Sequence, residues 1–507
     1  MKKKIRVRFA PSPTGPLHIG GLRTALYNYL FSKKHNGDFI LRIEDTDKKR
    51  NIKNSINYII KSLKWCNINY NEGYKNKGKY GPYIQSKRIN IYKKYIKILI
   101  KKKLAYYSFD KKKDIIKYKK KNKNFIYNSL TRKKLNNSLV LSKDDIINNI
   151  KKKKYVIRIK TPNNKNIIFY DKVYGKININ TNKIDDKIIF KSNNTPTYHF
   201  ASVIDDHLMK ITHIIRGKEW ISSTPIHIII YNYFKWKIPF FIHLPLILNN
   251  NKKGKISKRN INNEFPIYPI ISNYKSIKIK KSYEEIGFLP DSLINIIALL
   301  GWCPNPRNNK EIYNLKEMIK LFNFKNISKS DVHLNYKKCC WINKKYINKN
   351  NKKIQLLIYN KLFKIVKKKI KKYKKKYKNI YIKNVINITK NRINVINDIW
   401  NVSYYFFINP KKIHIDKKLI KKLKKNYNKI IIFLQKIKFF FIKKRKKKII
   451  KKFLKKIFKK YKNSIYIKTL RLSIVGKLIG INMLEILYTI KKDKIIKRIN
   501  NFIKIIK

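Results

Sequence analysis

The first fifty residues contain two strand-like segments with a helix-like segment between them, and this order constrains the fold more than any other feature. "IRVRFA" alternates apolar residues with arginine, as a half-exposed strand does. The helix-like segment carries apolar side chains at helical spacing: Leu22, Ala25, Leu26, Tyr29 and Leu30. This spacing predicts one buried helical face, and "GDFILRIED" then predicts a second strand. A strand, a helix and a strand of these lengths form the βαβ unit of a parallel sheet.

The loop that joins the first strand to the helix, "APSPTGPLHIGG", is rich in proline and glycine. In a parallel sheet this loop lies at the carboxyl edge, where ligands bind. Gly20 and Gly21 would let a ligand approach the backbone, His18 can donate to phosphate oxygens, and the free N–H groups of a helix N-terminus favour a phosphate. Taken alone, the loop fits a nucleotide phosphate site and a simple connector about equally well.

Composition changes along the chain indicate several domains, as expected for 507 residues. From about residue 111 to 194 the chain is rich in Lys and Asn and holds short strand-like pieces such as "YVIRIK" and "IIFYDKVYG", which indicates an inserted subdomain. An α/β pattern returns in "TPTYHFASVIDDHLMKITHIIRGKEW". From about Ile347 onward, apolar positions follow the helical period on a lysine background, so the last third is predicted to be all-α.

The charge balance is extreme, with 125 Lys and Arg against 26 Asp and Glu and a net charge of +99. A polyanionic partner such as RNA, DNA or an anionic membrane would suit this charge. The many Lys, Asn, Ile, Tyr and Phe residues and the scarcity of Ala and Gly also match a strongly AT-biased coding sequence. The charge therefore permits nucleic-acid binding without demonstrating it.

The cysteines and the apolar segments predict a cytoplasmic protein without a membrane partner. The four cysteines form no CxxC pair, which fits a reducing compartment. No apolar segment follows the basic N-terminus, so no signal peptide is expected. The most apolar late segment, residues 430–442, is interrupted by Lys436 and Lys438 and is too short for a membrane span, which needs roughly 20 apolar residues.

A second loop, "KISKR" at residues 255–259, places two lysines on either side of a serine. Such a loop can close over a triphosphate and stabilise the charge that develops as pyrophosphate leaves. In a chain this basic, a lysine–serine pentapeptide also arises easily by chance. By itself, this motif is a weak indication.

Together, "PLHIGG" and "KISKR" resemble the paired signature of class I aminoacyl-tRNA synthetases, and longer segments resemble the bacterial glutamyl-tRNA synthetases in that family's order. These segments are "RVRFAPSPTGPLHIGGLRTALYNYLF", "GDFILRIEDTD", "GPYIQS", "PTYHFASVIDDHLMKITHIIRGKEW", "SSTPIHIIIYNYF", "HLPLILN" and "KISKR". The resemblance is dense over residues 5–345 and patchy in the remainder. It implies a mixed α/β fold, in which a class I Rossmann-like catalytic domain with a parallel sheet and an α+β insertion precedes an all-α anticodon-binding region.

The resemblance also implies a domain order and a reaction. The catalytic domain is expected in two halves, 1–110 and 196–265, around an acceptor-stem-binding insertion at 111–195, followed by a stem-contact region at 266–345 and an anticodon-binding domain at 346–507. The implied enzyme is a glutamate–tRNA ligase that uses ATP with Mg²⁺ to form glutamyl-adenylate and then transfers glutamate to the terminal adenosine of tRNA(Glu). L-glutamate and tRNA(Glu) are the expected partners, and the protein is expected to be a monomer.

Site residues follow from the same resemblance, position by position. The expected catalytic residues are His18, Gly20, Lys255 and Lys258. The expected ATP contacts are Pro11, Ser12, Thr14, His18, Gly20, Gly21, Glu219, Lys255, Ser257 and Lys258. The expected glutamate contacts are Arg8, Ala10, Ser12, Glu44, Tyr198 and Arg216. Asp47 and Asp205 are expected at the tRNA 3′ end.

From the residues alone, simpler roles remain open for several of these positions. Arg8 also fits a solvent-facing strand residue, and Glu44 fits a cap at a strand end. The acidic clusters "RIEDTD" and "VIDDH" could bind a metal in principle, but the resemblance implies substrate and tRNA contacts there, so no protein metal site is expected. Lys218 departs from the family, which most often has another residue at that place.

Zinc and the alternative functions complete the sequence-based expectations. Some relatives carry a cysteine- and histidine-bound zinc in the insertion, but "AYYSFDKKK" and "NFIYNSLTRK" contain no cysteine, so no structural zinc is expected. Glutaminyl-tRNA synthetase is the nearest alternative, although it usually reads the anticodon with β-barrels, whereas this C-terminal part has helical periodicity. A tRNA-binding protein that has lost catalysis is a further alternative, and the completeness of both loops argues against it. Whether tRNA(Gln) is also charged stays open.

Overall fold

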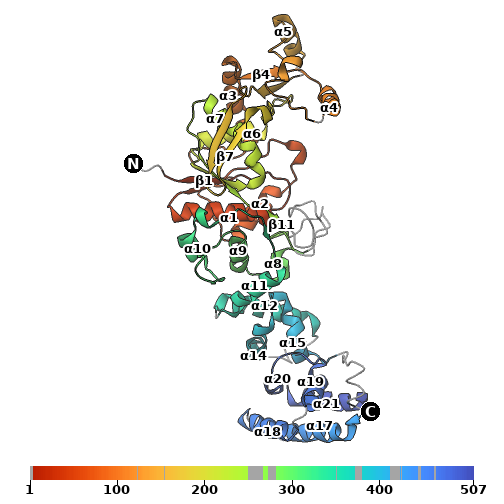
Figure 1. Cartoon of the computed structure of the whole chain (residues 1–507). Coiled ribbons are helices and arrows are strands. Elements are labelled where there is room, and N and C mark those ends of the chain that lie inside the picture. Colours follow the sequence, from red (N-terminus) through yellow and green to blue (C-terminus); the bar gives the residue numbers. More distant parts are fainter. Residues whose placement is uncertain are drawn as a thin grey trace. The chain divides into compact units, whose positions relative to one another are not determined.

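The computed structural model describes residues 4–506 apart from 123, 153–154, 249–265, 272–280, 350, 371–378, 411–422, 424, 443–446 and 462–463. The chain divides into two compact units (Figure 1). The first comprises Met1–Glu285 and Pro290–Cys339, and the second comprises Ile286–Leu289 and Cys340–Lys507.

The predicted βαβ unit is present at the start of the first unit. Strand β1 (Arg6–Phe9) leads through the proline-rich loop into helix α1 (Ile19–Lys34), and strand β2 (Asp38–Leu41) then pairs with β1 in parallel. The five apolar residues that define the predicted helical face are all buried. A short strand β3 (Glu72–Gly73) extends the sheet beyond β2.

Two later strands bring a second set of parallel pairs beside β1. Strand β9 (His213–Gly217) pairs in parallel with β10 (Phe240–Leu244). The backbone N–H of Thr212, just before β9, donates to the carbonyl oxygen of Arg6 in β1 at 2.9 Å. The carboxyl ends of β1, β2, β9 and β10 therefore lie at the same edge of the molecule, as in an open α/β fold.

Strand β1 is not half-exposed, contrary to the prediction from its alternating sequence. All four of its residues are buried, with Arg6 and Arg8 only 7% and 4% exposed. The guanidinium of Arg6 donates to Asp38 at 2.6 Å and to Glu72 at 2.8 Å. A buried arginine is tolerated when carboxylates pair with it, so alternation with arginine did not indicate a solvent-facing side here.

The segment expected to be an insertion contributes strands to two sheets. Strands β4 (Ala105–Ser108), β5 (Val156–Ile159) and β8 (Ile188–Phe190) form an antiparallel sheet. The hairpin of β6 (Asn166–Asp171) and β7 (Gly175–Asn180) instead joins the sheet of β9 and β10, where β6 pairs with β10. Helices α4 (Lys112–Lys121) and α5 (Lys143–Lys151) complete the segment.

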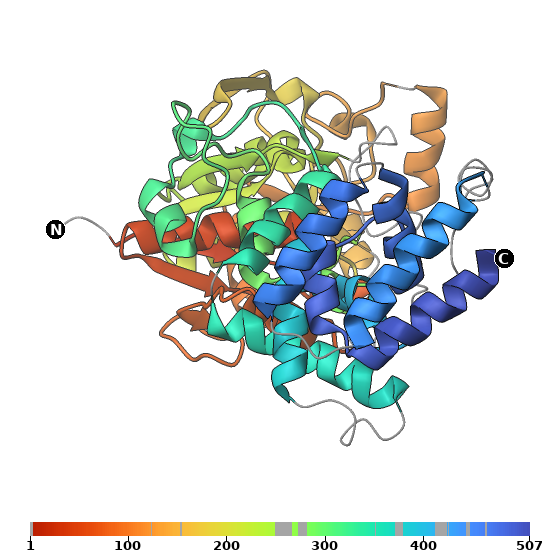
Figure 2. The same cartoon turned by 90° about the horizontal axis from the view of Figure 1, so that it is seen from below.

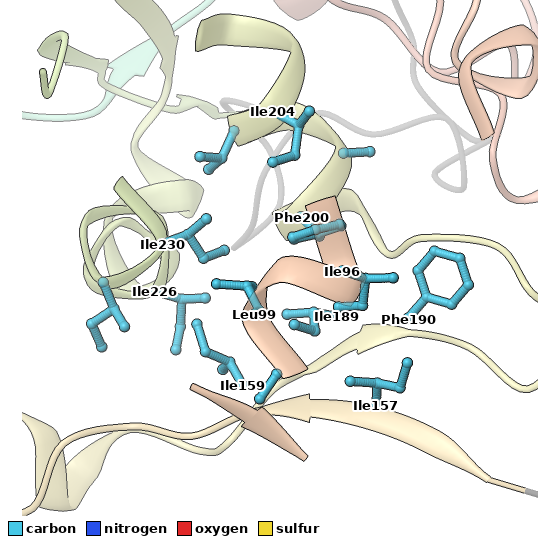
Figure 3. Packing of buried hydrophobic residues seen from close by; sticks show 14 of the residues in the cluster. Ile96, Leu99, Ile157, Ile159, Ile189, Phe190, Phe200, Ile204, Ile226 and Ile230 are labelled. Atoms are coloured by element: carbon cyan, nitrogen blue, oxygen red, sulfur yellow. The ribbon is translucent and has the colours of Figure 1, made fainter. Parts of the chain in front are cut away.

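One hydrophobic core connects the antiparallel sheet to three helices of the first unit. These helices are α3 (Ile89–Lys101), α6 (Tyr198–Leu208) and α7 (Thr224–Tyr233). Figure 3 shows Leu99, Ile159 and Ile230 from three different elements packed into this core. The segment expected to be an insertion therefore shares one hydrophobic core with α3, α6 and α7. The exact domain boundaries given above stay a prediction.

The remaining described elements of the chain are mostly helical. They are α2 (Ser55–Trp65), β11 (Ile247–Leu248), α8 (Tyr283–Ile286), α9 (Pro290–Ala298), α10 (Leu315–Leu321), β12 (Val332–His333), α11 (Tyr336–Asn348), α12 (Lys352–Lys369), α14 (Asn379–Thr389), α15 (Ile399–Phe407), α17 (Tyr427–Ile442), α18 (Lys447–Lys460), α19 (Ser464–Val475), α20 (Met483–Thr489) and α21 (Lys492–Ile506). In Figure 2 the elements from α12 to α21, cyan to blue, are helices, and no strand occurs among the described residues of the second unit. This confirms the predicted all-α C-terminal part. In the part of the chain that the structure describes, no helix has the length and apolar character to cross a membrane.

Candidate functional site

A pocket of about 430 Å³ opens at the carboxyl edge of the parallel strands in the first unit. The loop after β1, the segment after β2, the start of α6 and the end of β9 form its walls. Twelve of the predicted site residues line it: Arg8, Ala10, Ser12, Thr14, His18, Gly20, Gly21, Glu44, Asp47, Tyr198, Arg216 and Glu219. The structure thus brings together residues that are separated by up to about two hundred positions in the sequence.

His18 occupies the boundary between the loop and helix α1. It is the N-cap residue, and its Nδ1 accepts a hydrogen bond from the backbone N–H of Gly20 at 3.1 Å. A Cβ atom on Gly20 would lie 2.9 Å from His18 Cε1, so a larger residue would displace the ring. The glycine therefore lets the histidine cap the helix, and the ring stands beside the positive end of α1.

The loop itself is held against the segment that follows β2. The N–H of Glu44 donates to the carbonyl of Pro11 at 3.1 Å, and the N–H of Gly15 donates to Ser55 Oγ at 3.0 Å. Pro11 is thus an anchor of the loop and does not line the pocket. These contacts keep the loop close to the acidic segment "RIEDTD".

A buried ionic network forms one wall of the pocket. The guanidinium of Arg8 makes two hydrogen bonds to Asp206, at 2.9 and 3.1 Å. Asp206 also accepts from Arg42 Nη1 at 2.7 Å, and Arg42 Nη2 donates to Glu44 at 3.0 Å. Each of these four side chains is less than 8% exposed. Arg8 is therefore not the solvent-facing residue that its strand position also allowed.

The network shifts the pKa values of its acids in opposite directions. Burial alone would raise the pKa of Asp206, but the charges of Arg42 and Arg8 outweigh burial and lower it. For Glu44, burial dominates over Arg42 and Arg8, and its pKa is raised. Glu44 is thus a pocket-lining carboxylate whose charged form a cation in the pocket would favour.

Arg216 differs from Arg8 in the kind of partner that surrounds it. It is 5% exposed and lies near the end of β9. Its five hydrogen-bond partners are all uncharged acceptors: Tyr198 Oη, Thr224 Oγ1, the carbonyl of Trp220 and one ring nitrogen each of His227 and His243. Among the described residues, no carboxylate forms an ion pair with it. A buried guanidinium without an anion, at the wall of a pocket, is suited to bind a ligand carboxylate.

Gly217 and Lys218, which precede Glu219, differ in their relation to the pocket. A Cβ on Gly217 would lie 2.1 Å from Glu219 Oε2, so glycine permits the folded-back Glu219 side chain. Lys218, which departs from the family pattern, pairs with Asp331 at 2.6 Å and does not line the pocket. The departure therefore adds no charge to the pocket wall.

One further predicted residue that the structure describes, Asp205, does not line the pocket. Asp205 is fully buried beneath the pocket, where its carboxylate accepts from Gln85, Arg88 and Tyr92 at 3.0, 2.7 and 2.8 Å. These contacts favour a structural role for Asp205, and its contact with the tRNA 3′ end stays a prediction. Lys255, Ser257 and Lys258 lie outside the described residues.

Sequence reasoning missed Arg42, His243 and Asp171 as parts of the site, and it singled out Asp206 as part of an acidic cluster without predicting its ion pairs with Arg8 and Arg42. His243 is the register partner of Arg216 in the parallel pair of β9 and β10. Polar residues near the carboxyl ends of neighbouring strands were the signal that could have identified it. For Asp206 and Arg42, the signal was charge in segments that are otherwise apolar and buried.

No cluster of three or more His, Cys, Asp or Glu side chains in the described part of the chain could hold a metal ion. Cys339 is buried and Cys340 is partly buried, as expected for packing residues.

Comparisons with known proteins match both units. Residues 4–341 match the model of the catalytic domain of class I tRNA synthetases (E and Q), and residues 361–503 match the model of an anticodon binding domain. A glutamate–tRNA ligase from Azobacteroides pseudotrichonymphae is 46% identical over 83% of this chain and 82% of its own length. A glutamate–tRNA ligase from Flavobacterium psychrophilum is 38% identical over 99% of both chains. The crystal structure of a glutamate tRNA ligase from Elizabethkingia meningosepticum, in complex with its amino acid, matches with a TM-score of 0.89 and 36% identity over 100% of both chains.

Proposed function

This chain belongs to the bacterial glutamate–tRNA ligases, a family of class I aminoacyl-tRNA synthetases, and we propose that the pocket described above is where it activates glutamate with ATP. The family resemblance of its motifs is thereby confirmed, and so is the combination of a mixed α/β catalytic part with a helical anticodon-binding part. The observation that carries the proposal is the buried guanidinium of Arg216, which has no carboxylate partner among the residues that the structure describes and lines the same pocket as the capped N-terminus of α1.

Glutamate would bind at the Arg216 side of the pocket. The planar guanidinium of Arg216 suits the side-chain carboxylate, because arginine can donate two parallel hydrogen bonds to a carboxylate. Glu44 would receive the α-ammonium, whose charge offsets the cost of burying the ionised Glu44. Arg8, Ala10, Ser12 and Tyr198 would complete the glutamate site, since all four line the pocket.

ATP would bind at the His18 side. The N-terminus of α1, with Gly20 and Gly21, offers backbone N–H groups to phosphate oxygens, and His18 adds a side-chain donor. Ser12, Thr14 and Glu219 line the same cavity, and Pro11 holds the loop in place from behind. Lys255, Ser257 and Lys258 would act on the phosphates as the cationic loop. Mg²⁺ would accompany ATP because phosphate oxygens are its preferred ligands.

The reaction that this arrangement serves requires positioning and charge stabilisation. The α-carboxylate of glutamate attacks the α-phosphorus of ATP, the bond to the β,γ-phosphates breaks, and pyrophosphate leaves with its negative charge. Donors from α1, His18 and the KISKR loop would stabilise that charge. The terminal adenosine hydroxyl of tRNA(Glu) then takes the glutamyl group, and AMP leaves. Asp47, exposed at the rim of the pocket, is placed to meet the tRNA end.

Several further properties are part of the same proposal. We propose that the second unit binds the anticodon region of tRNA(Glu), that the protein acts as a monomer in the cytoplasm, and that it holds no structural zinc. The domain ranges given in the sequence analysis are proposed with it.

Glutamate-dependent ATP–pyrophosphate exchange, measured with and without tRNA(Glu), tests the function. We expect exchange with glutamate and none with glutamine. Exchange supported by glutamine would favour the glutaminyl-specific alternative, and no exchange even with tRNA(Glu) would favour a protein without catalysis. Charging of tRNA(Glu) and tRNA(Gln) in parallel assays would then define the tRNA specificity.

A further inference from the structure

Asp171 and His243 have no role in the proposed function. His243 contacts Arg216, and Asp171 contacts His243. His243 is fully buried on β10, and Asp171 is 4% exposed at the end of β6. Arg216 Nε donates to His243 Nε2 at 3.1 Å, and His243 Nδ1 lies 2.8 Å from Asp171 Oδ2. The imidazole of His243 therefore connects Asp171, on the β6–β7 hairpin, to the arginine at the proposed glutamate side of the pocket.

The donor character of arginine defines the protonation of this imidazole. A guanidinium has only donors, so His243 Nε2 must accept and cannot carry a proton. The ring proton therefore sits on Nδ1 and is donated to Asp171 Oδ2. Burial lowers the pKa of His243, with its bond to Asp171 acting in the opposite direction, so the ring is neutral and Nε2 keeps its lone pair.

Asp171 is itself held from both sides. Its Oδ1 accepts the backbone N–H groups of Val173 and Tyr174, both at 2.9 Å, and its Oδ2 also accepts the backbone N–H of His243 at 3.0 Å. The carboxylate therefore has a defined orientation, and so does the imidazole that donates to it.

The place of the histidine between the two charges has a physical reason. A carboxylate bonded directly to Arg216, as Asp206 is to Arg8, would neutralise the guanidinium and compete with a ligand carboxylate. With His243 between them, Asp171 orients Arg216 through a neutral ring and leaves its charge available.

We propose that His243 and Asp171 are positioning residues that hold Arg216 in the orientation needed to bind the side-chain carboxylate of the substrate. This inference rests on the proposed role of Arg216 as the glutamate-binding arginine. It predicts that loss of the acceptor at His243 Nε2 affects glutamate binding selectively. Among the described residues, this nitrogen contacts Arg216 and, at 3.3 Å, Thr224 Oγ1, and of these two only Arg216 has a proposed role in binding the substrate.

The test compares two neutral polar replacements in the full-length enzyme. His243→Gln can place an amide oxygen near the Nε2 position, whereas His243→Asn can reach only the Nδ1 position. In ATP–pyrophosphate exchange, we expect the KM for glutamate to rise about tenfold or more in His243→Asn, as for a buried donor left unpaired. In His243→Gln the KM for glutamate should rise clearly less than in His243→Asn, because the acceptor for Arg216 is kept and only the bond to Asp171 is lost, and the KM for ATP should change less than about twofold in both variants.

Two further variants complete the experiment. Asp171→Asn should raise the glutamate KM in the same direction as His243→Asn, because an amide cannot accept all the N–H groups that the carboxylate accepts. His213→Gln, at the opposite end of β9, is the matched control and should leave both KM values unchanged.

The outcomes separate this inference from the proposed function. Equal glutamate KM values in His243→Asn and His243→Gln would overturn the positioning role, and so would a rise in the KM for ATP as large as the rise in the KM for glutamate. A raised glutamate KM in Arg216→Ala would still support the glutamate site in that case. An unchanged glutamate KM in Arg216→Ala would overturn both.

Discussion

At the scale of single residues, His18 combines a structural contact with a proposed chemical one, and substitutions can separate them. His18→Asn keeps an N-cap acceptor for α1, whereas His18→Ala removes it. We expect unfolding measurements to give His18→Asn near-wild-type stability and His18→Ala a loss of about 1 kcal/mol. Pyrophosphate exchange should fall about a hundredfold in both variants, because each lacks the imidazole donor to phosphate.

The same pair of variants defines what would contradict this role. Full exchange activity in a stable His18→Asn protein would mean that His18 only caps the helix.

At the scale of elements, Asp206 on α6 connects strand β1 to the segment that follows β2, through Arg8 and Arg42. Asp206→Asn would leave Arg8 and Arg42 without the carboxylate that they share. We expect a loss of about 3 to 5 kcal/mol in the free energy of unfolding, as for a broken buried ion pair. This contribution is lost as pH falls through the lowered pKa of Asp206, because protonation removes the charge that both arginines need.

A surface pair supplies the control for that prediction. Glu317→Gln removes the exposed ion pair between Lys310 and Glu317 and should cost less than about 1 kcal/mol. Urea unfolding of both variants at pH 7 compares their free energies of unfolding. Similar losses in the two variants would show that the buried network stabilises the fold no more than an exposed ion pair does.

These elements also show what a sequence can reveal. The βαβ unit and the helical C-terminal part were predictable because their apolar periodicity is local. The motifs predicted Arg8, Glu44 and Arg216 as site residues, and all three line the pocket. The partners of Arg8 and Arg216 were not predictable from spacing, since Asp206 and His243 come from distant segments and contact the two arginines only after the strands pair. For the same reason, the burial of β1 was misjudged.

At the scale of the whole molecule, one buried histidine, His227, and two partly buried histidines, His199 and His213, make stability depend on pH. Burial lowers the pKa of His199 and His213 to about 4 and that of His227 well below its ordinary value. The unfolded chain takes up these protons near pH 6.5, so it binds more protons than the folded chain as pH falls from about 6.5 to 4. The free energy of unfolding should therefore decrease over this range, by up to about 1.4 kcal/mol per pH unit for each histidine.

Urea unfolding at several pH values between 7 and 5 measures this slope. His213→Gln should make this slope shallower, and an unchanged slope in that variant would contradict its assignment to the partly buried His213.

The net charge of +99 leads to a prediction for RNA binding. If many lysines neutralise tRNA phosphates, counterions are released, and the affinity for tRNA(Glu) should fall at least about tenfold between 50 and 200 mM salt. The KM for glutamate, measured over the same salt range, is the control and should change little, because Arg216 is buried. A weak dependence of tRNA affinity on salt would mean that most of the lysines do not contact the RNA.

The buried ionic network also limits how far the composition of this chain can drift. At the surface, replacing an acid by lysine changes little more than the net charge. At Asp206, the same replacement would put a third cation beside Arg8 and Arg42, in a place without water to screen it. A nucleotide bias that favours lysine codons is therefore opposed by protein stability at such positions. The few acids of this chain should be its least tolerant sites in a saturation mutagenesis screen wherever an arginine lies buried against them.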